Sequence, residues 1–203
     1  MNFMIPCSCW CGRFEGQNKY GSMTRIGLTL KEVLMEFKLK TISKAGIPEA
    51  ISKAELYRSL NEPEEAESIC RDILVVEPEH QLALRLLGLA ITDQFCGDAS
   101  DRSGEVEKLF QRLAEPYERL YYTGLLHERR AKAQMSVGRT PHTLAPLFAE
   151  AMHCFAEAEV IRPTGNDDAI LRWNRCARLL QSHPGFVEER ESEGFDAFDS
   201  SPI

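Results

Sequence analysis

The chain lacks the residue patterns of the common catalytic and membrane classes. No run of eighteen apolar residues occurs in its 203 positions, so we expect no membrane-spanning helix. Its five histidines form neither an H-x3-H nor an H-E-x-x-H pair. A G-x-S-x-G motif, a phosphate-binding glycine loop and a dinucleotide fingerprint are also missing. We therefore predict neither an enzyme nor a site for a metal or cofactor.

Concentrated positive charge is missing too. The 24 basic and 31 acidic residues give a formal net charge of −7, and residues 187–203 alone hold six acids and one base. The rest of the chain is thus close to neutral, which disfavours a nucleic-acid partner because such partners need a concentrated basic surface. The N-terminus shows no charged segment followed by an apolar stretch, so we expect no signal peptide and a cytoplasmic location.

The seven cysteines fall into two groups. Cys7, Cys9 and Cys11 are spaced closely enough to chelate a soft metal, but no second pair follows, so we expect no metal there. Their segment is interpreted as unstructured, or as sequence upstream of a true start at Met23. The other four cysteines are dispersed, and three lie on helical apolar stripes, as expected for reduced and buried thiols.

One spacing of small and apolar residues before a proline occurs twice in the chain. A helix with small residues one turn apart lets a neighbouring helix approach closely, and the proline ends it. A related pattern, L-x2-L-G-x2-I, lies between the two copies. The residues are Ala66-x3-Cys70-x2-Ile73-x4-Pro78, Ala151-x3-Phe155-x2-Ala158-x4-Pro163, and Leu84-x2-Leu87-Gly88-x2-Ile91.

These motifs resemble the tetratricopeptide repeat family over roughly residues 48–181. The resemblance implies an all-α fold of about three helix pairs, stacked as a right-handed solenoid that binds a protein or peptide. Two further stretches, 117–131 and 162–174, look like a bacterial group of repeat proteins without an assigned activity. The resemblance attaches no catalytic chemistry to the chain.

The repeats also set the expected domain boundaries. Residues 1–46 should be a largely disordered extension with a short amphipathic helix over 29–41, and 183–203 a disordered acidic tail. The repeat domain should span 47–182. Its long helix over 117–137 should end at Gly138, and residues 139–146 lengthen the third unit by about eight residues. A capping helix over 166–181 should direct Leu171 and Trp173 towards the array.

The first helix of each pair lines the concave groove in this family, and this rule selects the candidate site. Arginine there can hold a carboxylate through two parallel hydrogen bonds, so the partner is predicted to be a protein or peptide with acidic groups. The predicted groove residues are Arg58, Arg85, Glu128, Lys132, Arg172 and Arg175, with Glu55, Asp93 and Asp168 as further acids.

Three alternatives to this groove function stay open. The charged face around Glu128 can be a solvated helix face with intrahelical pairs such as Glu128–Lys132. The acidic tail can fold back into its own groove, where a tether makes weak contacts sufficient. The chain can also be a structural subunit that docks through its convex or edge surface, which an exposed apolar patch near Tyr121, Tyr122 or Phe148 would favour.

Overall fold

A computed structural model describes residues 37–96, 102–183 and 185–186 of the chain. The chain divides between residues 41 and 42, and every helix of the described residues lies after this division. The all-α prediction is confirmed, since these residues form helices and no strand. The helices are η1 (Lys44–Gly46), α2 (Ile47–Ser59), α3 (Pro63–Val76), α4 (Gln81–Asp93), α5 (Ser103–Gln111), α6 (Pro116–Ser136), α7 (Pro141–Val160) and α8 (Asp168–Ser182).

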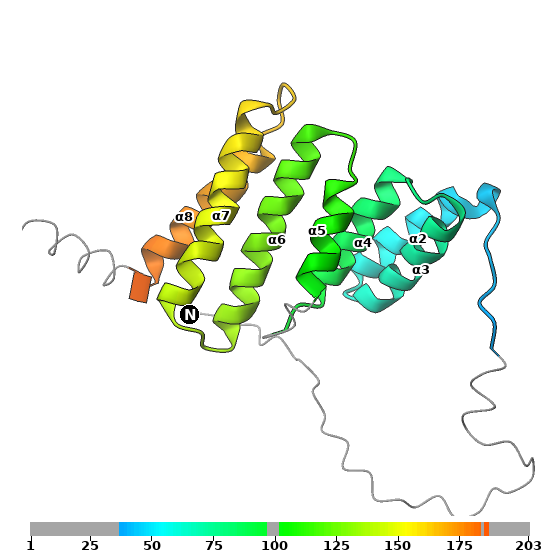
Figure 1. Cartoon of the computed structure of the whole chain (residues 1–203), viewed down its shortest axis with the longest axis horizontal. Helices are drawn as coiled ribbons and strands as arrows, with labels where there is room; N and C mark the ends of the chain where they lie inside the picture. Colours follow the sequence, from blue (N-terminus) through cyan, green and yellow to red (C-terminus); the bar gives the residue numbers. More distant parts are fainter. Residues whose placement is uncertain (1–36, 97–101, 184, 187–203) are drawn as a thin grey trace, which may run out of the picture. The chain divides into compact units, whose positions relative to one another are not determined.

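Each helix packs against the next one in the chain, and Figure 1 shows them following one another from α2 to α8. A second series of contacts joins α2 to α4, α4 to α6, and α6 to α8. We call these four helices the even-helix layer. The intervening helices α3, α5 and α7 each pack between two of its members, which is consistent with a helical-repeat solenoid. None of the described helices is long and apolar enough to cross a membrane.

Proline and glycine set many of the helix boundaries. Proline lies in the first turn of α2, α3, α6 and α7, where its missing N–H costs no intrahelical hydrogen bond. Gly138 ends α6 as predicted, with a positive φ of 80°. Asn166 prepares the start of α8, because its Oδ1 accepts a hydrogen bond from the backbone N–H of Asp168 at 3.0 Å.

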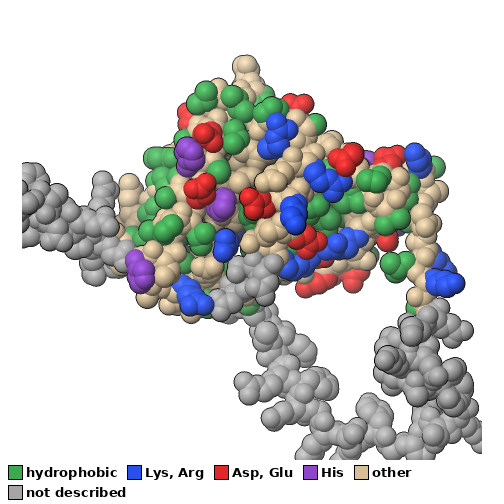
Figure 2. Space-filling view, in the orientation of Figure 1, with side chains coloured by type: hydrophobic (Ala, Val, Ile, Leu, Met, Phe, Trp, Pro, Cys, Tyr) green, Lys and Arg blue, Asp and Glu red, His purple; other side chains and the backbone are tan. Residues whose placement is uncertain are grey.

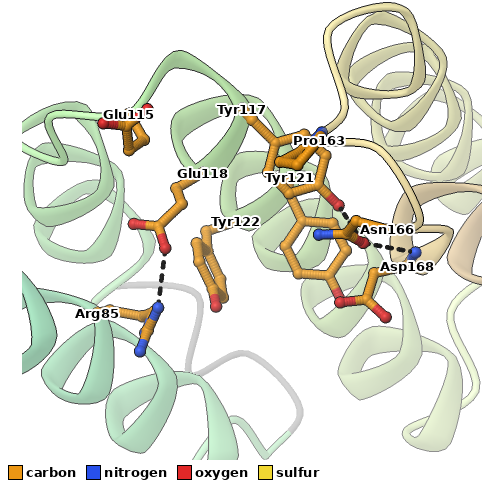
Figure 3. A pocket seen from close by; sticks show the side chains of 9 residues that line it. All are labelled: Arg85, Glu115, Tyr117, Glu118, Tyr121, Tyr122, Pro163, Asn166 and Asp168. Atoms are coloured by element: carbon orange, nitrogen blue, oxygen red, sulfur yellow. Dashed lines mark hydrogen bonds and ion pairs between the residues drawn. The ribbon is translucent and has the colours of Figure 1, made fainter.

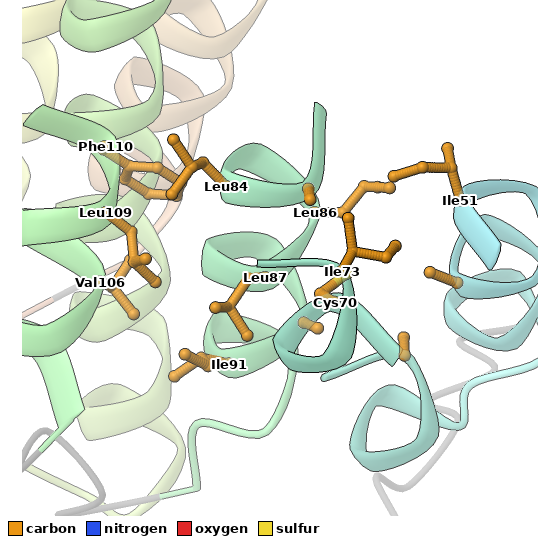
Figure 4. Close-up of a cluster of buried hydrophobic side chains, with 14 of the residues drawn as sticks. Ile51, Cys70, Ile73, Leu84, Leu86, Leu87, Ile91, Val106, Leu109 and Phe110 are labelled. Atoms are coloured by element: carbon orange, nitrogen blue, oxygen red, sulfur yellow. The ribbon is translucent and has the colours of Figure 1, made fainter. Parts of the chain in front are cut away.

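Two clusters of buried side chains form the core. The first is built by α2 to α5 and is shown in Figure 4. The second is built by α6, α7 and α8. Leu126 of α6 belongs to the first cluster and its neighbour Leu125 to the second, because successive residues of a helix point about 100° apart. Helix α6 is therefore the wall that the two clusters share.

The repeated spacing does mark core positions, as predicted. All six of its residues before the prolines are fully buried: Ala66, Cys70, Ile73, Ala151, Phe155 and Ala158. Burial raises the pKa of the Cys70 thiol to about 12, and that of Cys154 and Cys176 to about 11, so these three thiols are protonated near neutral pH. Cys7, Cys9 and Cys11 lie outside the described residues.

Glycine in the even-helix layer makes room for the largest of these core residues. A Cβ atom on Gly88 would lie 2.3 Å from Cε1 of Phe110, and one on Gly124 would lie 2.8 Å from Cε1 of Phe155. Both rings are fully buried. The phenylalanine of α5 thus packs on bare backbone of α4, and that of α7 packs on bare backbone of α6.

The first helix pair has different residues at the corresponding positions. Ala54 lies 34 positions before Gly88, and Cys70 has the place in α3 that Phe155 has in α7 by the repeated spacing. Ala54 and Cys70 are both fully buried. A small thiol therefore stands where the other pair has a ring, so a methyl group is tolerated on the facing helix.

Three sequence predictions need correction. Residues 37–41 are not helical, so the predicted helix over 29–41 does not extend through them, and the rest of it lies outside the described residues. Residues 141–146 do not precede the third unit's second helix but belong to it, since α7 begins at Pro141 and continues through Pro146. Leu171 and Trp173 point outward, being 63% and 39% exposed, because α8 buries Ala169, Cys176 and Leu179 instead.

Glu67 of α3 joins three helices through side-chain hydrogen bonds. Glu67 accepts hydrogen bonds from Arg102 at 2.5 Å, from Gln94 at 2.7 Å and from Arg71 at 2.8 Å. Burial by itself raises the pKa of Glu67, but these donors outweigh it and bring the pKa down to about 2. Glu67 therefore fastens α3 to the end of α4 and to the start of α5.

We predict that Gly88→Ala destabilises the protein by about 1–3 kcal/mol, although alanine is the better helix former, because the new methyl group overlaps the Phe110 ring. Gly104→Ala in α5 is the matched control: nothing lies within 4 Å of its added Cβ, so stability should rise or stay within about 1 kcal/mol. Urea unfolding measures both, and adding Phe110→Leu to Gly88→Ala should recover part of the loss. Equal effects of the two glycine changes would contradict the packing.

The lowered pKa of Glu67 predicts an acid-sensitive contribution to stability. Its folded pKa of about 2 lies below the ordinary 4.5, so the contribution is complete above about pH 4.5 and is lost as the pH falls towards 2. The free energy of unfolding of the natural protein should therefore converge with that of Glu67→Gln over this range. Glu65→Gln, an exposed acid on the same helix, is the control and should keep the natural profile.

Candidate functional site

The structure brings several predicted groove residues together across the even-helix layer. Arg58 of α2 forms an ion pair with Asp93 of α4 at 2.7 Å, and Asp93 forms a second one with Arg129 of α6 at 2.5 Å. All three side chains are only 22–25% exposed. One carboxylate thus links three helices of the layer, in a setting where ion pairs are screened less than at an open surface.

Arg129 is the residue that sequence reasoning missed. Besides Asp93, its guanidinium donates to the carbonyl of Leu89 at 3.1 Å and to the hydroxyl of Thr92 at 2.5 Å. Burial lowers the pKa of Arg129, while the charge of Asp93 raises it. The sequence showed Arg129 only as one member of a charged run, and its pairing with an acid 36 positions earlier has no local signal.

Glu128 departs most from its expected place. Its side chain is fully buried, although we predicted a groove residue and weighed a solvated face as the alternative. The predicted intrahelical pair with Lys132 is present, and Arg172 of α8 approaches to 3.7 Å. Its Oε2 atom has no hydrogen-bond partner among the described residues. Glu128 therefore serves as the anchor for two cations that reach the surface, and it does not face a partner itself.

The remaining two candidates differ from each other. Arg175 of α8 is exposed, and we find no ion pair for it within the described part of the chain. Arg85 of α4 forms an ion pair with Glu118 of α6 at 2.8 Å, and its guanidinium lies 6.0 Å from the ring centre of Tyr122. Arg85 is thus apart from the other five and belongs to a different feature of the layer.

We call the group from Arg58 to Arg175 the charged strip. It crosses α2, α4, α6 and α8, and its five cations exceed its two anions by three charges. Its members are Arg58, Asp93, Glu128, Arg129, Lys132, Arg172 and Arg175. In Figure 2, too, acidic and basic side chains lie beside one another on the visible face and do not form large regions of one sign.

A pocket of about 280 Å³ lies on the same layer, at the starts of α6 and α8. Three tyrosines of α6 form its wall, and the loop between α7 and α8 closes one side (Figure 3). The hydroxyl of Tyr117 donates to Oδ1 of Asn166 at 3.2 Å, which ties that loop to α6. We call it the tyrosine pocket; its lining residues are Arg85, Glu115, Tyr117, Glu118, Tyr121, Tyr122, Pro163, Asn166 and Asp168.

The pocket and the strip occupy different parts of the same helices. Arg85 and Glu118 lie near the starts of α4 and α6, whereas Asp93 is the last residue of α4 and Arg129 lies well into α6. Tyr121 lies between the two features, because it lines the pocket and its side chain also interacts with Arg172 of the strip. The layer thus has an acidic, aromatic part beside a basic one.

Histidine, cysteine and carboxylate side chains are the remaining candidates for catalysis or metal binding. No group of three or more His, Cys, Asp or Glu residues that could hold a metal ion occurs within the described ranges. His127 is the described histidine with a shifted pKa, which burial lowers, and its Nδ1 has no hydrogen-bond partner among the described residues. The chain matches no protein-family model, no curated protein and no solved structure.

We predict that Asp93→Ala destabilises the protein by about 1–3 kcal/mol, because it leaves Arg58 and the half-buried Arg129 without their shared carboxylate. Glu49→Ala, which removes an exposed pair with Lys53 on α2, is the matched control and should cost less than about 0.5 kcal/mol. Chemical denaturation measures both variants. A similar cost for the two would show that the link between three helices contributes nothing.

Proposed function

We propose that this chain is a non-catalytic scaffold of the tetratricopeptide-repeat type, which binds a protein or peptide on its even-helix layer. The charged strip carries the proposal. It runs across all four helices of that layer, so it offers a series of cations to an extended segment that lies over them. The repeated helix pairs support a protein or peptide partner, and the excess of three positive charges supports a partner with acidic groups. The cytoplasm is the location that we propose for this binding.

Arg172 and Arg175 are the residues we expect to contact the partner. Both lie on α8 and reach the surface, and Arg175 has its guanidinium unengaged within the described part of the chain. Arg172 forms an ion pair with Glu128 and interacts with Tyr121, and these contacts favour one orientation of its guanidinium before a partner arrives. A carboxylate that pairs with both arginines therefore meets one cation with partners of its own, Arg172, and one that is unengaged among the described residues, Arg175.

A second candidate function is docking into a larger assembly through the edge of the array. The apolar patch that would favour it near Phe148 is not formed, since Phe148 is fully buried and Tyr121 and Tyr122 pack against the core. Another observation does favour it: Leu171 and Trp173 expose apolar surface on α8, the last helix of the array.

Site-specific crosslinking separates these functions. A photoreactive residue is placed at Arg175 on the strip, at Trp173 on the edge, or at Lys108 on α5 outside the layer, and crosslinked partners are identified by mass spectrometry. We expect partner crosslinks from position 175 and not from 108. Crosslinks from position 173 alone would overturn the proposal in favour of edge docking.

We further predict that Arg175→Glu reduces capture of that partner at least about fivefold, because it replaces an attractive charge by a repulsive one. Lys108→Glu, an equal charge reversal on α5, should leave capture unchanged. Arg172 is better tested as Arg172→Gln, since a glutamate there would lie against buried Glu128 and disturb the fold. Unchanged capture by both arginine variants, with native circular dichroism, would contradict the groove assignment.

A further inference from the structure

The tyrosine pocket has chemistry opposite to that of the strip. Three carboxylates and one guanidinium line it, and Glu118 already pairs with Arg85. The other two carboxylates, of Glu115 and Asp168, belong to exposed residues, and we find no ion pair for either in the described part of the chain. The lining therefore has an excess of two negative charges, with the tyrosine rings between the two free acids (Figure 3).

At one end of the pocket, the lining residues already hold a cation, the guanidinium of Arg85. The guanidinium of Arg85 is held by the Glu118 carboxylate at 2.8 Å and lies near the face of Tyr122. A carboxylate and an aromatic face together are a favourable setting for a positive group. The other end presents the same two chemical components in Tyr117, Tyr121 and Asp168, and among the described residues no cation forms an ion pair with the Asp168 carboxylate.

The geometry of the rings suits a side chain better than a larger ligand. Tyr117 and Tyr121 stack with ring centres 5.8 Å apart, and Tyr122 meets Tyr121 edge-on at 5.1 Å, so the three rings pack against one another. A volume of about 280 Å³ falls below the usual ~300–1,000 Å³ of pockets for drug-sized molecules. Burial raises the pKa of Tyr117 and the nearby charge of Asp168 raises it further, consistent with a negative potential in the pocket.

We propose that the tyrosine pocket binds a lysine or arginine side chain of the partner segment, beside an acidic group held on the strip. This inference rests on the proposed function and refines it: the preferred segment carries a cation as well as an acid. Tyr121, which contacts both features, places the two subsites next to each other. An acidic segment without a basic residue would leave the pocket unfilled.

The test uses the full chain and four synthetic probes. These are acetylated, amidated nonapeptides of glycine and serine whose central residue is lysine, arginine, norleucine or glutamate. Each is titrated in 150 mM salt while NMR signals of Tyr117, Tyr121 and Asn166 are followed. We expect saturable shifts with the lysine and arginine peptides and none with the norleucine and glutamate peptides. Equal responses to lysine and norleucine would overturn the proposal.

Variants locate the binding. Glu115→Gln with Asp168→Asn should weaken binding of the lysine peptide at least about fivefold, since both free carboxylates are lost. Glu62→Gln with Glu65→Gln, at the start of α3, removes the same charge elsewhere and should change nothing. Tyr117→Leu keeps every charge but removes a ring, and should also weaken binding. If the α3 variant weakens binding as much as the pocket variant, the interaction is nonspecific and the proposal fails.

The outcomes of this test and of the crosslinking test are separable. The peptide titration depends on Glu115, Asp168 and Tyr117, whereas partner capture was assigned to Arg172 and Arg175. If the lysine peptide does not bind in the pocket but Arg175 still supports partner capture, only the proposed cation subsite is disproved. If the pocket binds the lysine peptide but no partner crosslinks at position 175, the proposed scaffold function of the strip is disproved.

Discussion

The close approach of paired helices at Gly88 and Gly124 is the constraint on which the rest of this structure depends. At both positions a phenylalanine of the next helix lies where a side chain would otherwise be. The rings of Phe110 and Phe155 are large, so each fills the space between two helices only because the facing residue has no Cβ atom. These contacts hold α4 against α5 and α6 against α7, and thereby set the spacing of the even-helix layer.

Helix α6 connects the two halves of the array, because it contributes side chains to both buried clusters. Leu125 and Leu126 send their side chains into different clusters, so neither cluster is complete without this helix. The same helix supplies the tyrosines of the pocket and three residues of the strip. The candidate binding features are therefore built on the element with the most extensive packing, which is where side chains are positioned most rigidly.

The charged residues of the even-helix layer differ in depth. The more buried ones have structural roles, and the proposed binding roles belong to exposed ones. Asp93 and Glu128 are withdrawn from solvent and hold arginines from other helices in place. Arg175, Glu115 and Asp168 lie at the surface, where the proposed partner would contact them. A buried acid that orients a surface cation lowers the entropy lost on binding, which applies to Arg172 beside Glu128.

The sequence by itself determined the helices and the core stripes of the pairs. Periodic small residues followed by proline act within one or two turns, so Ala66, Cys70, Phe155 and Ala158 could be assigned to the core without a structure. The face of α8 was assigned wrongly, because several of its faces carry apolar residues and only the neighbour decides which one is buried. Likewise Arg85 could be placed on the layer, but not in a pocket.

Only the tertiary structure decided which charges meet. Arg129 pairs with Asp93 across 36 positions, Arg172 reaches Glu128 across 44, and Tyr117 reaches Asn166 across 49. Such pairs leave no periodicity in the sequence, since they depend on how far each helix extends and how neighbouring helices align. The long α6 and α7 set that alignment, and the tyrosine pocket exists because the loop after α7 returns to the start of α6.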